Sequence, residues 1–386
     1  MNPKLGGVSH AVNTYSKHLN RFNISSTIVT VDPQNVDFYV AANLVTLGPS
    51  SQFWRYSALY KPWLENHILD YDIVMLHGIW LYQDYALLKV IKKYAKGNKS
   101  VPKLFVMPHG MLDPYFQKSK KRLLKAIRNF IYWQLVQKQV INEAACVLYT
   151  SKEEMLASSK TFWGYKPKKV LDIGLGVPEP PKKEPTNAFL LQHPNLADTR
   201  YLLFLGRIDI KKGIEELLDA YDLVYNKFWA QRKNLPKLVI AGPGIDTKYG
   251  QLLLKRVAQS ACLVDNIYFA GMLSGAVKWG AFYGCESFIS PSHHESFGIS
   301  VVEAMACEKP VLITNKINIY QEILDGHCGF VENDNVAGCV ELLTKWMSAD
   351  AIERQLMSEN ALKTYQQIFK DEQATANLYH ALVNEQ

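Results

Sequence analysis

The chain of 386 residues is 48% hydrophobic and 20% charged, a composition that excludes a disordered protein and predicts globular domains with more than one core. No apolar run approaches the roughly 18 residues of a membrane span, and residues 1–5 lack the apolar segment of a signal peptide. The net charge of +7 is uneven, because residues 1–175 hold 23 Lys and Arg against 11 Asp and Glu, while the rest hold 20 against 25. Such a basic half favours a negatively charged partner, such as nucleic acid, anionic lipid or a phosphorylated substrate.

Short β-branched runs alternate with amphipathic stretches, which is the pattern of parallel sheets joined by crossover helices. The first half has predicted strands at 26–31, 73–76, 103–107, 146–149 and 170–173, and helices that include 83–94 and 118–138. The second half has predicted strands at 201–205, 237–241, 266–270, 287–290 and 310–314, each followed by a helix. After Asn335 only helical spacing continues. We therefore predict the α/β class with two Rossmann-like domains.

A proline-rich segment separates the two series. Pro178, Pro180, Pro181 and Pro185 lie among charged residues and interrupt all periodicity, as a linker does. We therefore predict a first domain at 1–177 and a second at 178–362. The helical end at 363–386 is predicted to pack back on the first domain.

The segment after the predicted strand 287–290 carries the strongest functional signal. In open α/β sheets, ligands lie beyond the carboxyl ends of strands, where helices begin. The backbone N–H groups of Ser296, Phe297 and Gly298 would lie at such a helix start, which favours a phosphate. Glu295 precedes the helix, and Glu303 lies far enough along it to accept hydrogen bonds from ribose hydroxyls. A helix cap and a solvated helix residue are the alternative interpretation of the two glutamates.

A second turn follows the predicted strand 201–205 and carries Arg207 and Lys212, five residues apart. Arg offers a planar fork and Lys a mobile point charge, so the pair could clamp a diphosphate and neutralise a departing group. Solvated loop charges are the alternative interpretation.

Together these segments resemble glycosyltransferase family 4, the group 1 glycosyltransferases of bacterial polysaccharide biosynthesis. The resemblance rests on Gly206-Arg207 with Lys212-Gly213, on residues 241–244 and 269–271, and on Glu295 with Glu303, and it covers nearly the whole chain. It implies the GT-B fold, with two domains facing across a cleft, and sugar transfer with retention at the anomeric centre.

The resemblance also implies roles for single residues of the second domain. Arg207 and Lys212 would bind the donor diphosphate, and Glu295 would face the donor sugar near its reacting carbon. The turn formed by Ser296, Phe297, Gly298 and Ile299 would hold phosphate, with Glu303 on the ribose. Gly271 and Met272 would hold the nucleobase through backbone contacts, although a purely structural turn is the alternative there.

The first half carries further segments that resemble this family. His109 follows the predicted strand 103–107 and would face the donor sugar, while Asp113 in the same turn could serve acceptor hydroxyls or be an ordinary turn residue. Gly6 and Gly7 resemble the family's glycine loop, whose backbone approaches the donor phosphate or the acceptor. The family places an apolar strand before that loop, and residues 1–5 do not predict one, so we expect the first strand of this domain to be missing.

A basic stretch in the first half suggests a membrane surface. The cations are Lys118, Lys120, Lys121, Arg122, Lys125 and Arg128, and the apolar residues among and after them are Ile127, Phe130, Ile131 and Trp133. A helix of this composition could rest on an anionic bilayer. A helix with a solvated basic face and a core face is the alternative.

We therefore predict a retaining, metal-independent hexosyltransferase that needs no cofactor. Its substrates would be a UDP- or GDP-sugar donor and a sugar or lipid-linked acceptor, in cell-surface polysaccharide biosynthesis, and nucleic acid is not expected as a partner. The six cysteines form no C-x-x-C pair, so we expect a reduced cytoplasmic protein, peripheral at the inner face of the plasma membrane. The alternatives are a nucleotide-sugar epimerase or glycoside phosphorylase on the same fold, or an inactive donor-binding protein.

Overall fold

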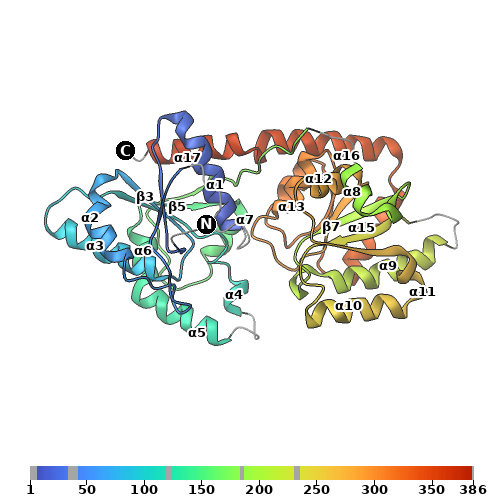
Figure 1. Cartoon of the computed structure of the whole chain (residues 1–386), viewed down its shortest axis with the longest axis horizontal. Coiled ribbons are helices and arrows are strands. Elements are labelled where there is room, and N and C mark those ends of the chain that lie inside the picture. Colours follow the sequence, from blue (N-terminus) through green and yellow to red (C-terminus); the bar gives the residue numbers. More distant parts are fainter. Residues whose placement is uncertain (1–6, 34–41, 119–122, 183–186, 230–234, 385–386) are drawn as a thin grey trace. The chain divides into compact units, whose positions relative to one another are not determined.

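The computed structural model describes residues 7–33, 42–118, 123–182, 187–229 and 235–384. The chain divides into two compact units, one formed by Met1–Gly176 with Asp371–Gln386 and the other by Val177–Lys370. Each unit contains parallel β-sheet with helices packed on it (Figure 1), which confirms the predicted α/β class with two Rossmann-like domains.

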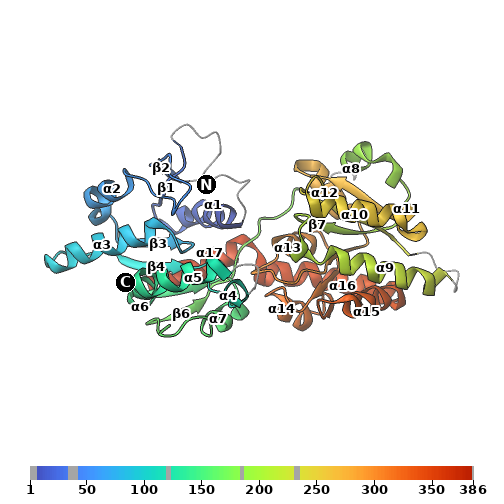
Figure 2. The same ribbon diagram turned by 90° about the horizontal axis from the view of Figure 1, so that it is seen from below.

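The first unit contains two parallel sheets. The larger has the order β3-β4-β5-β6, and the smaller pairs β1 with β2 and lies apart from it (Figure 2). The strands of the first unit are β1 (Thr27–Thr30), β2 (Asn43–Thr46), β3 (Ile73–His77), β4 (Lys103–Met107), β5 (Cys146–Tyr149) and β6 (Val170–Asp172). Its helices are α1 (Gly7–Leu19), α2 (Tyr60–His67), α3 (Tyr82–Lys96), α4 (Tyr115–Lys118), α5 (Leu123–Tyr132), α6 (Lys138–Glu143), α7 (Lys152–Ser158) and α17 (Asp371–Val383).

The C-terminal helix α17 belongs to this first unit, where it packs beside α1 (Figure 1). His18 on α1 and Asp371 at the start of α17 are both buried, and Nε2 lies 2.7 Å from Oδ2. A buried carboxylate requires such a partner, so this contact fixes where the returning chain joins the unit.

The second unit contains one six-stranded parallel sheet of order β12-β11-β10-β7-β8-β9. Its strands are β7 (Tyr201–Leu205), β8 (Lys237–Ala241), β9 (Ile267–Gly271), β10 (Ser287–Ser290), β11 (Val311–Thr314) and β12 (Gly329–Glu332). Its helices are α8 (Asn187–Gln192), α9 (Ile214–Trp229), α10 (Lys248–Gln259), α11 (Ala261–Asn266), α12 (Gly275–Gly284), α13 (Ile299–Ala306), α14 (Tyr320–Asp325), α15 (Val336–Ser348) and α16 (Ala351–Thr364).

Helices cover both faces of this sheet. Leu202 and Phe204 of β7 point into a core shared with α9, α10 and α15, whereas Phe288 of β10 meets Phe282 of α12 on the other face. Every residue of β10 and β11 is buried, because a parallel sheet covered on both sides has no solvent face. This burial explains why these strands form continuous apolar runs in the sequence.

The structure differs from the predicted elements in three places. The edge strands β2 and β12 were not predicted. The predicted helix 118–138 is broken into α4, α5, the π-helical turn η5 (Trp133–Gln137) and α6, with residues 119–122 outside the described residues. Trp133 is fully buried and stacks on Phe162, so it belongs to the core and not to a membrane surface.

Residues 1–6 lie outside the described residues, and with them Gly6 and the predicted absence of a first strand. None of the helices in the described segments combines the length and the apolar composition needed to cross a bilayer.

Candidate functional site

The two turns predicted to bind the donor follow neighbouring strands of the second sheet. β7 and β10 pair in parallel at its centre, and the strand order runs away from them in both directions. Their carboxyl ends therefore flank the switch point of the sheet, which is where open α/β folds bind ligands. Both predicted turns thus reach one edge of one sheet.

Glycine allows the turn after β7 to approach the loop after β10. Asp209 caps the short helix η7 (Ile210–Lys212), and its Oδ1 accepts a hydrogen bond from Lys211 N at 3.0 Å. Gly213 follows with a φ of 65°, and a Cβ there would lie 2.1 Å from the carbonyl oxygen of Pro291. Only glycine fits this contact, which holds Lys212 against the loop after β10.

Lys212 and Glu295 form an ion pair between these two loops, with Nζ in contact with Oε1 and each side chain 23% exposed. Burial, and then the positive charge of Arg207, lower the pKa of Lys212 to about 8. The Glu295 carboxylate acts in the opposite direction and favours the ammonium form. Arg207 itself is exposed. Two cations and a carboxylate therefore meet at the carboxyl edge.

The backbone around Glu295 is held from several sides. Glu295 N donates a hydrogen bond to Lys316 O at 3.0 Å, in the loop after β11. His293 lies between two carboxylates, with Nδ1 3.0 Å from Asp334 Oδ2 and Nε2 3.2 Å from Glu216 Oε1. These contacts were not predicted from the sequence, and they fix the loop from which Glu295 projects.

The helix α13 begins directly after this loop. Gly298 at its N-cap has a φ of 89°, and no side chain of the described residues caps the helix. Its first N–H groups and its partial positive charge can therefore serve an anion. Phe297 is buried and packs edge-on against Phe369, so it can offer a ligand only its backbone, while Ser296 and Ile299 are half-buried.

Glu303 lies on α13 and is paired with a lysine that the sequence did not single out. Its Oε1 accepts a hydrogen bond from Lys278 Nζ of α12 at 2.8 Å, and Glu303 is nearly buried. The ammonium group also lies 4.0 Å from the centre of the Trp279 ring. Lys278 and Glu303 are 25 positions apart and come from two different helices, so no local spacing indicates the pair.

The loops after β7, β8 and β9 pack through glycine backbone. Gly271 ends β9 with a φ of 71°, and its carbonyl accepts a hydrogen bond from Gly242 N at 2.7 Å. A Cβ on Gly242 would lie 1.9 Å from Gly206 O. Met272 is 71% exposed beside them. The backbone role in nucleobase binding that the resemblance implies for Gly271 and Met272 remains a prediction.

The remaining predicted residues belong to the first unit. His109 follows β4 with a φ of 53°, and its Nε2 lies 3.0 Å from Nδ1 of His77. Asp113 is buried, and its Oδ1 accepts a hydrogen bond at 2.8 Å from the backbone N–H two residues later. Gly7 is exposed as the first residue of α1, and Gly6 lies outside the described residues.

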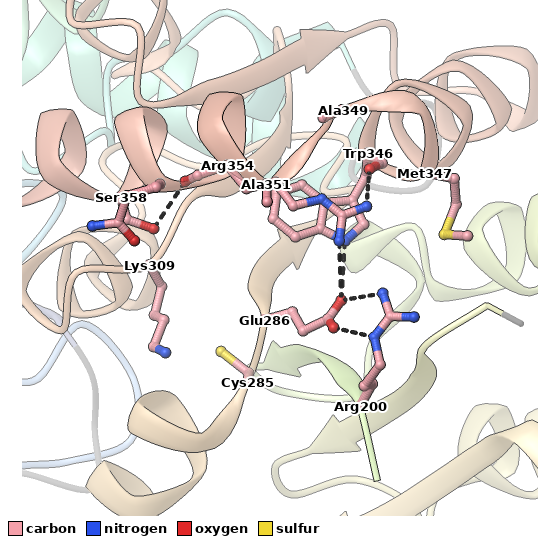
Figure 3. Close-up of a pocket in the computed structure, with 11 residues that line it drawn as sticks. Arg200, Cys285, Glu286, Lys309, Trp346, Met347, Ala349, Ala351, Arg354 and Ser358 are labelled. Atoms are coloured by element: carbon pink, nitrogen blue, oxygen red, sulfur yellow. Dashed lines mark hydrogen bonds and ion pairs between the residues drawn. The ribbon is translucent and has the colours of Figure 1, made fainter.

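A pocket of about 580 Å³ lies at the opposite edge of the second sheet, near the amino ends of β7 and β10 (Figure 3). At its centre Glu286 pairs with Nε and Nη2 of Arg200 and lies 3.4 Å from Nε1 of Trp346 and 3.9 Å from Nη1 of Arg354. None of the described residues predicted for the donor site lines this pocket.

Sequence comparison relates the second unit to a known protein family. Residues 190–364 match the family of glycosyl transferases group 1. The chain is 24% identical over 181 residues to the capsular polysaccharide biosynthesis glycosyltransferase CapM of Staphylococcus aureus, covering 47% of this chain and 45% of that protein. It is 30% identical over 176 residues to a phosphatidyl-myo-inositol mannosyltransferase of Mycobacterium leprae, covering 45% and 43%. The chain thus matches less than half the length of these relatives.

Solved structures resemble nearly the whole chain. A glycosyltransferase from Rickettsia africae has a TM-score of 0.75 at 15% identity, covering 98% of this chain and 95% of that one. Anabaena HepE, solved in complex with UDP and glucose, has a TM-score of 0.72 at 16% identity, covering 98% and 96%. Likeness at such low identity concerns the fold, and it confirms the predicted GT-B fold.

Proposed function

We propose that this chain, which belongs to the glycosyl transferases group 1 family through residues 190–364, is a retaining, metal-independent hexosyltransferase. The donor is a UDP- or GDP-sugar, and the acceptor is a sugar or lipid-linked sugar of cell-surface polysaccharide biosynthesis. The observation that carries the proposal is the meeting of Arg207, Lys212 and Glu295 at the switch point of the second sheet. The UDP and glucose bound by HepE and the capsular role named for CapM support it.

In this proposal, each group acts on one part of the donor. Arg207 and Lys212 neutralise the diphosphate, aided by the uncapped start of α13 at Ser296, Phe297, Gly298 and Ile299. Glu303 accepts hydrogen bonds from the ribose, and Gly271 and Met272 contact the base. Glu295 and His109 serve the donor sugar, and Asp113 serves the acceptor. Gly6 and Gly7 serve the acceptor or the donor phosphate.

Transfer then requires little covalent chemistry from the protein. The bond between the anomeric carbon and the diphosphate oxygen breaks, and the acceptor hydroxyl oxygen bonds to the same face of that carbon. The departing nucleoside diphosphate gains negative charge and takes up the hydroxyl proton. Arg207 and Lys212 stabilise that charge, which is the kind of preorganised electrostatic contribution that dominates many enzymes.

Calorimetric titration with UDP and GDP tests the donor site. Lys212→Ala and Glu303→Gln are each expected to weaken binding by ~10- to 100-fold, since a hydrogen bond to a charged group contributes about 1.5–3 kcal/mol. Lys255→Ala removes an exposed lysine of α10 in the same unit and should leave binding unchanged. Full binding by both site variants would refute the assignment.

Product analysis with a panel of UDP- and GDP-sugars separates the proposal from its alternatives. A glycosyltransferase forms product only with an acceptor and keeps the anomeric configuration. An epimerase would convert the donor without an acceptor, and a glycoside phosphorylase would require inorganic phosphate. Binding without turnover on any donor would indicate an inactive donor-binding protein.

We also propose that the first unit rests on an anionic membrane surface, on the evidence of α5 at the outside of this unit (Figure 1). Six large apolar side chains on α5 and η5 are between 50% and 83% exposed, and we call them the α5 apolar face: Leu123, Leu124, Ile127, Phe130, Ile131 and Leu135. Most are three or four residues apart and so share one side of the helix. The opposite side is anchored by the buried Asn129 and Trp133.

The positive charge beside the α5 apolar face favours an anionic bilayer over an apolar protein as its partner. Lys125 and Arg128 are exposed on the same helix, within a basic half of the chain. Basic residues next to an apolar helical face are typical of interfacial helices, and each contributes about 1 kcal/mol at an anionic surface. The protein would then act from the cytoplasm at the inner face of the plasma membrane, where lipid-linked acceptors are accessible.

Flotation with phosphatidylcholine vesicles, with and without phosphatidylglycerol, tests this surface. The wild type should bind the anionic vesicles, and the double variant Ile127→Glu with Ile131→Glu should lose at least tenfold in binding, because each inserted side chain contributes about 1.5–3 kcal/mol. Leu223→Glu replaces a lone exposed leucine of α9 and serves as the control. Unchanged binding by the double variant, or a dimer that this variant disrupts, would refute the membrane proposal.

A further inference from the structure

Two turns of the first unit meet at the carboxyl ends of β3 and β4. These strands pair in parallel with His77 opposite Met107, and Gly78 N donates a hydrogen bond to Met107 O at 2.9 Å. Met111 joins the turns, since its carbonyl accepts a hydrogen bond from Trp80 Nε1 at 3.3 Å. The side chains that project from the two turns are therefore held in a fixed relation.

The backbone at His109 is locked by a buried carboxylate. His109 and Gly110 are both left-handed, with φ of 53° and 77°, and a histidine holds that conformation only where its surroundings impose it. Glu154 of α7 is fully buried, and its Oε1 accepts a hydrogen bond from Gly110 N at 2.5 Å. Its Oε2 accepts a second one from Thr150 N at 3.0 Å. The His109 ring thus projects from a rigid base.

The rings of His77 and His109 stack and share a hydrogen bond. Their centres are 5.3 Å apart at an interplanar angle of 25°, and Nδ1 of His77 lies 3.0 Å from Nε2 of His109. Burial lowers the pKa of His77 to about 4, and burial together with the neighbouring ring lowers the pKa of His109 well below its usual value. Both rings are therefore neutral at pH 7.

The hydrogen bond between the two rings couples their tautomers, because each neutral ring carries only one N–H proton. A neutral imidazole has one N–H donor and one bare acceptor nitrogen. If His77 Nδ1 donates, then Nε2 of His109 is bare and its proton sits on Nδ1. If His109 Nε2 donates instead, then Nδ1 of His77 is bare and its proton sits on Nε2. Either way, the two rings must hold the same tautomer.

We propose that His77 is a positioning residue that fixes the ring angle and the tautomer of His109, and thereby decides whether His109 Nδ1 donates a hydrogen bond to the donor sugar or accepts one from it. This inference rests on the proposed function, in which His109 faces that sugar. His77 itself need not touch the substrate. Its effect falls on the orientation of the sugar for transfer and not on donor binding, which the second unit supplies.

Heteronuclear NMR of the full chain labelled with ¹⁵N in its histidine rings tests the tautomer coupling directly. His77→Asn and His109→Asn assign the two rings. In the wild type at pH 7, both rings should be neutral and carry the same tautomer, either Nδ1–H or Nε2–H. Opposite tautomers, or a charged ring, would overturn the proposal whether or not the chain has transferase activity.

Steady-state kinetics test the positioning role. His77→Phe keeps a stacked ring but removes the hydrogen bond, so kcat should fall by roughly 3- to 10-fold while KM for the donor stays within a factor of two. The ¹⁵N signals of His109 should then shift toward a mixture of both tautomers. His77→Asn places an amide near the Nδ1 position and should restore part of kcat. His67→Phe, at an exposed histidine of α2, is the matched control.

The outcomes separate this inference from the proposed function. An active wild type whose kcat is unchanged by His77→Phe would refute the positioning role and leave the transferase assignment standing. A wild type that binds donor but transfers no sugar would refute the function, while the NMR spectra would still decide whether the tautomers are coupled. Native signals of the remaining histidines in each variant exclude misfolding as the cause of a loss.

Discussion

The two edges of the second sheet hold similar charged groups in different ways. At the amino edge, Glu286 is bound by Arg200 through two nitrogens and lies near Trp346 and Arg354, so its oxygens are fully engaged (Figure 3). At the carboxyl edge, Glu295 and Glu303 each meet one lysine, and an uncapped helix and the exposed Arg207 adjoin them. A single ammonium is a partner that a ligand can replace, whereas a set of converging donors holds a carboxylate in place.

This difference shows that a cluster of charged residues does not by itself indicate a binding site. The amino edge contains a described pocket, but its charged groups bind one another and stabilise the packing of α15 and α16 on the sheet. At the carboxyl edge, Glu295 and Glu303 each pair with a single lysine, and glycines bring the loops close together. We therefore expect substitutions at the carboxyl edge to change donor binding and those at the amino edge to change stability.

The largest effect should come from Gly242→Ala, which tests the glycine backbone of the carboxyl edge. Its Cβ would meet the Gly206 carbonyl at 1.9 Å, so two loops must separate. We expect a loss of ~3 kcal/mol in unfolding free energy and weaker UDP binding, measured by urea denaturation and calorimetry. Gly275→Ala is the control, because its φ is also positive but nothing lies within 4 Å of the added carbon. Equal losses in both variants would contradict the role of close approach.

Glu286→Gln at the amino edge should have a smaller effect, which falls on stability and not on UDP binding. It weakens the contacts with Arg200 and Arg354 at the amino edge, and we expect ~1–2 kcal/mol of destabilisation, less than for a buried pair because Arg200 is half exposed. The dissociation constant for UDP should stay unchanged. A variant of normal stability with impaired UDP binding would break the comparison between the two edges.

The smallest effect concerns pH. Because the pKa of Lys212 is lowered to about 8, its ammonium is present below that pH and is lost as the pH rises above it. UDP affinity should therefore fall by up to ~10-fold between pH 7 and pH 9. Lys212→Arg keeps its charge and should remove this dependence. An equally steep decline in the Arg variant would assign the titration to another group.

The central strands could be predicted because they are buried on both faces, while the two edge strands β2 and β12 could not. β10 and β11 form unbroken apolar runs, but β2 and β12 are short, half-buried and carry polar residues such as Asn43 and Glu332. Nothing in a four-residue, half-polar segment distinguishes an edge strand from a loop. Such a strand is defined by the neighbouring strand with which it pairs, and its own sequence does not indicate that pairing.

The same distinction holds for the candidate site. Arg207, Lys212 and Glu295 follow predicted strands, so the rule that parallel strands end at one edge brings them together. The partners of the site do not follow from any such rule. Glu154 is 44 positions from Gly110, and Asp334 is 41 positions from His293. Their contacts depend on how helices and loops pack, which local spacing does not specify.

The lysine partners of Glu295 and Glu303 mean that both carboxylates are already paired before any nucleotide binds. In the proposed donor site, a donor would exchange these internal pairs for its own groups, so its affinity would measure the difference between two sets of contacts. A nucleotide without ribose hydroxyls would leave Lys278 on Glu303 and gain nothing there. In the proposed donor site, breaking these pairs would be a cost that only a complete nucleotide, with its hydroxyls and phosphates, could offset.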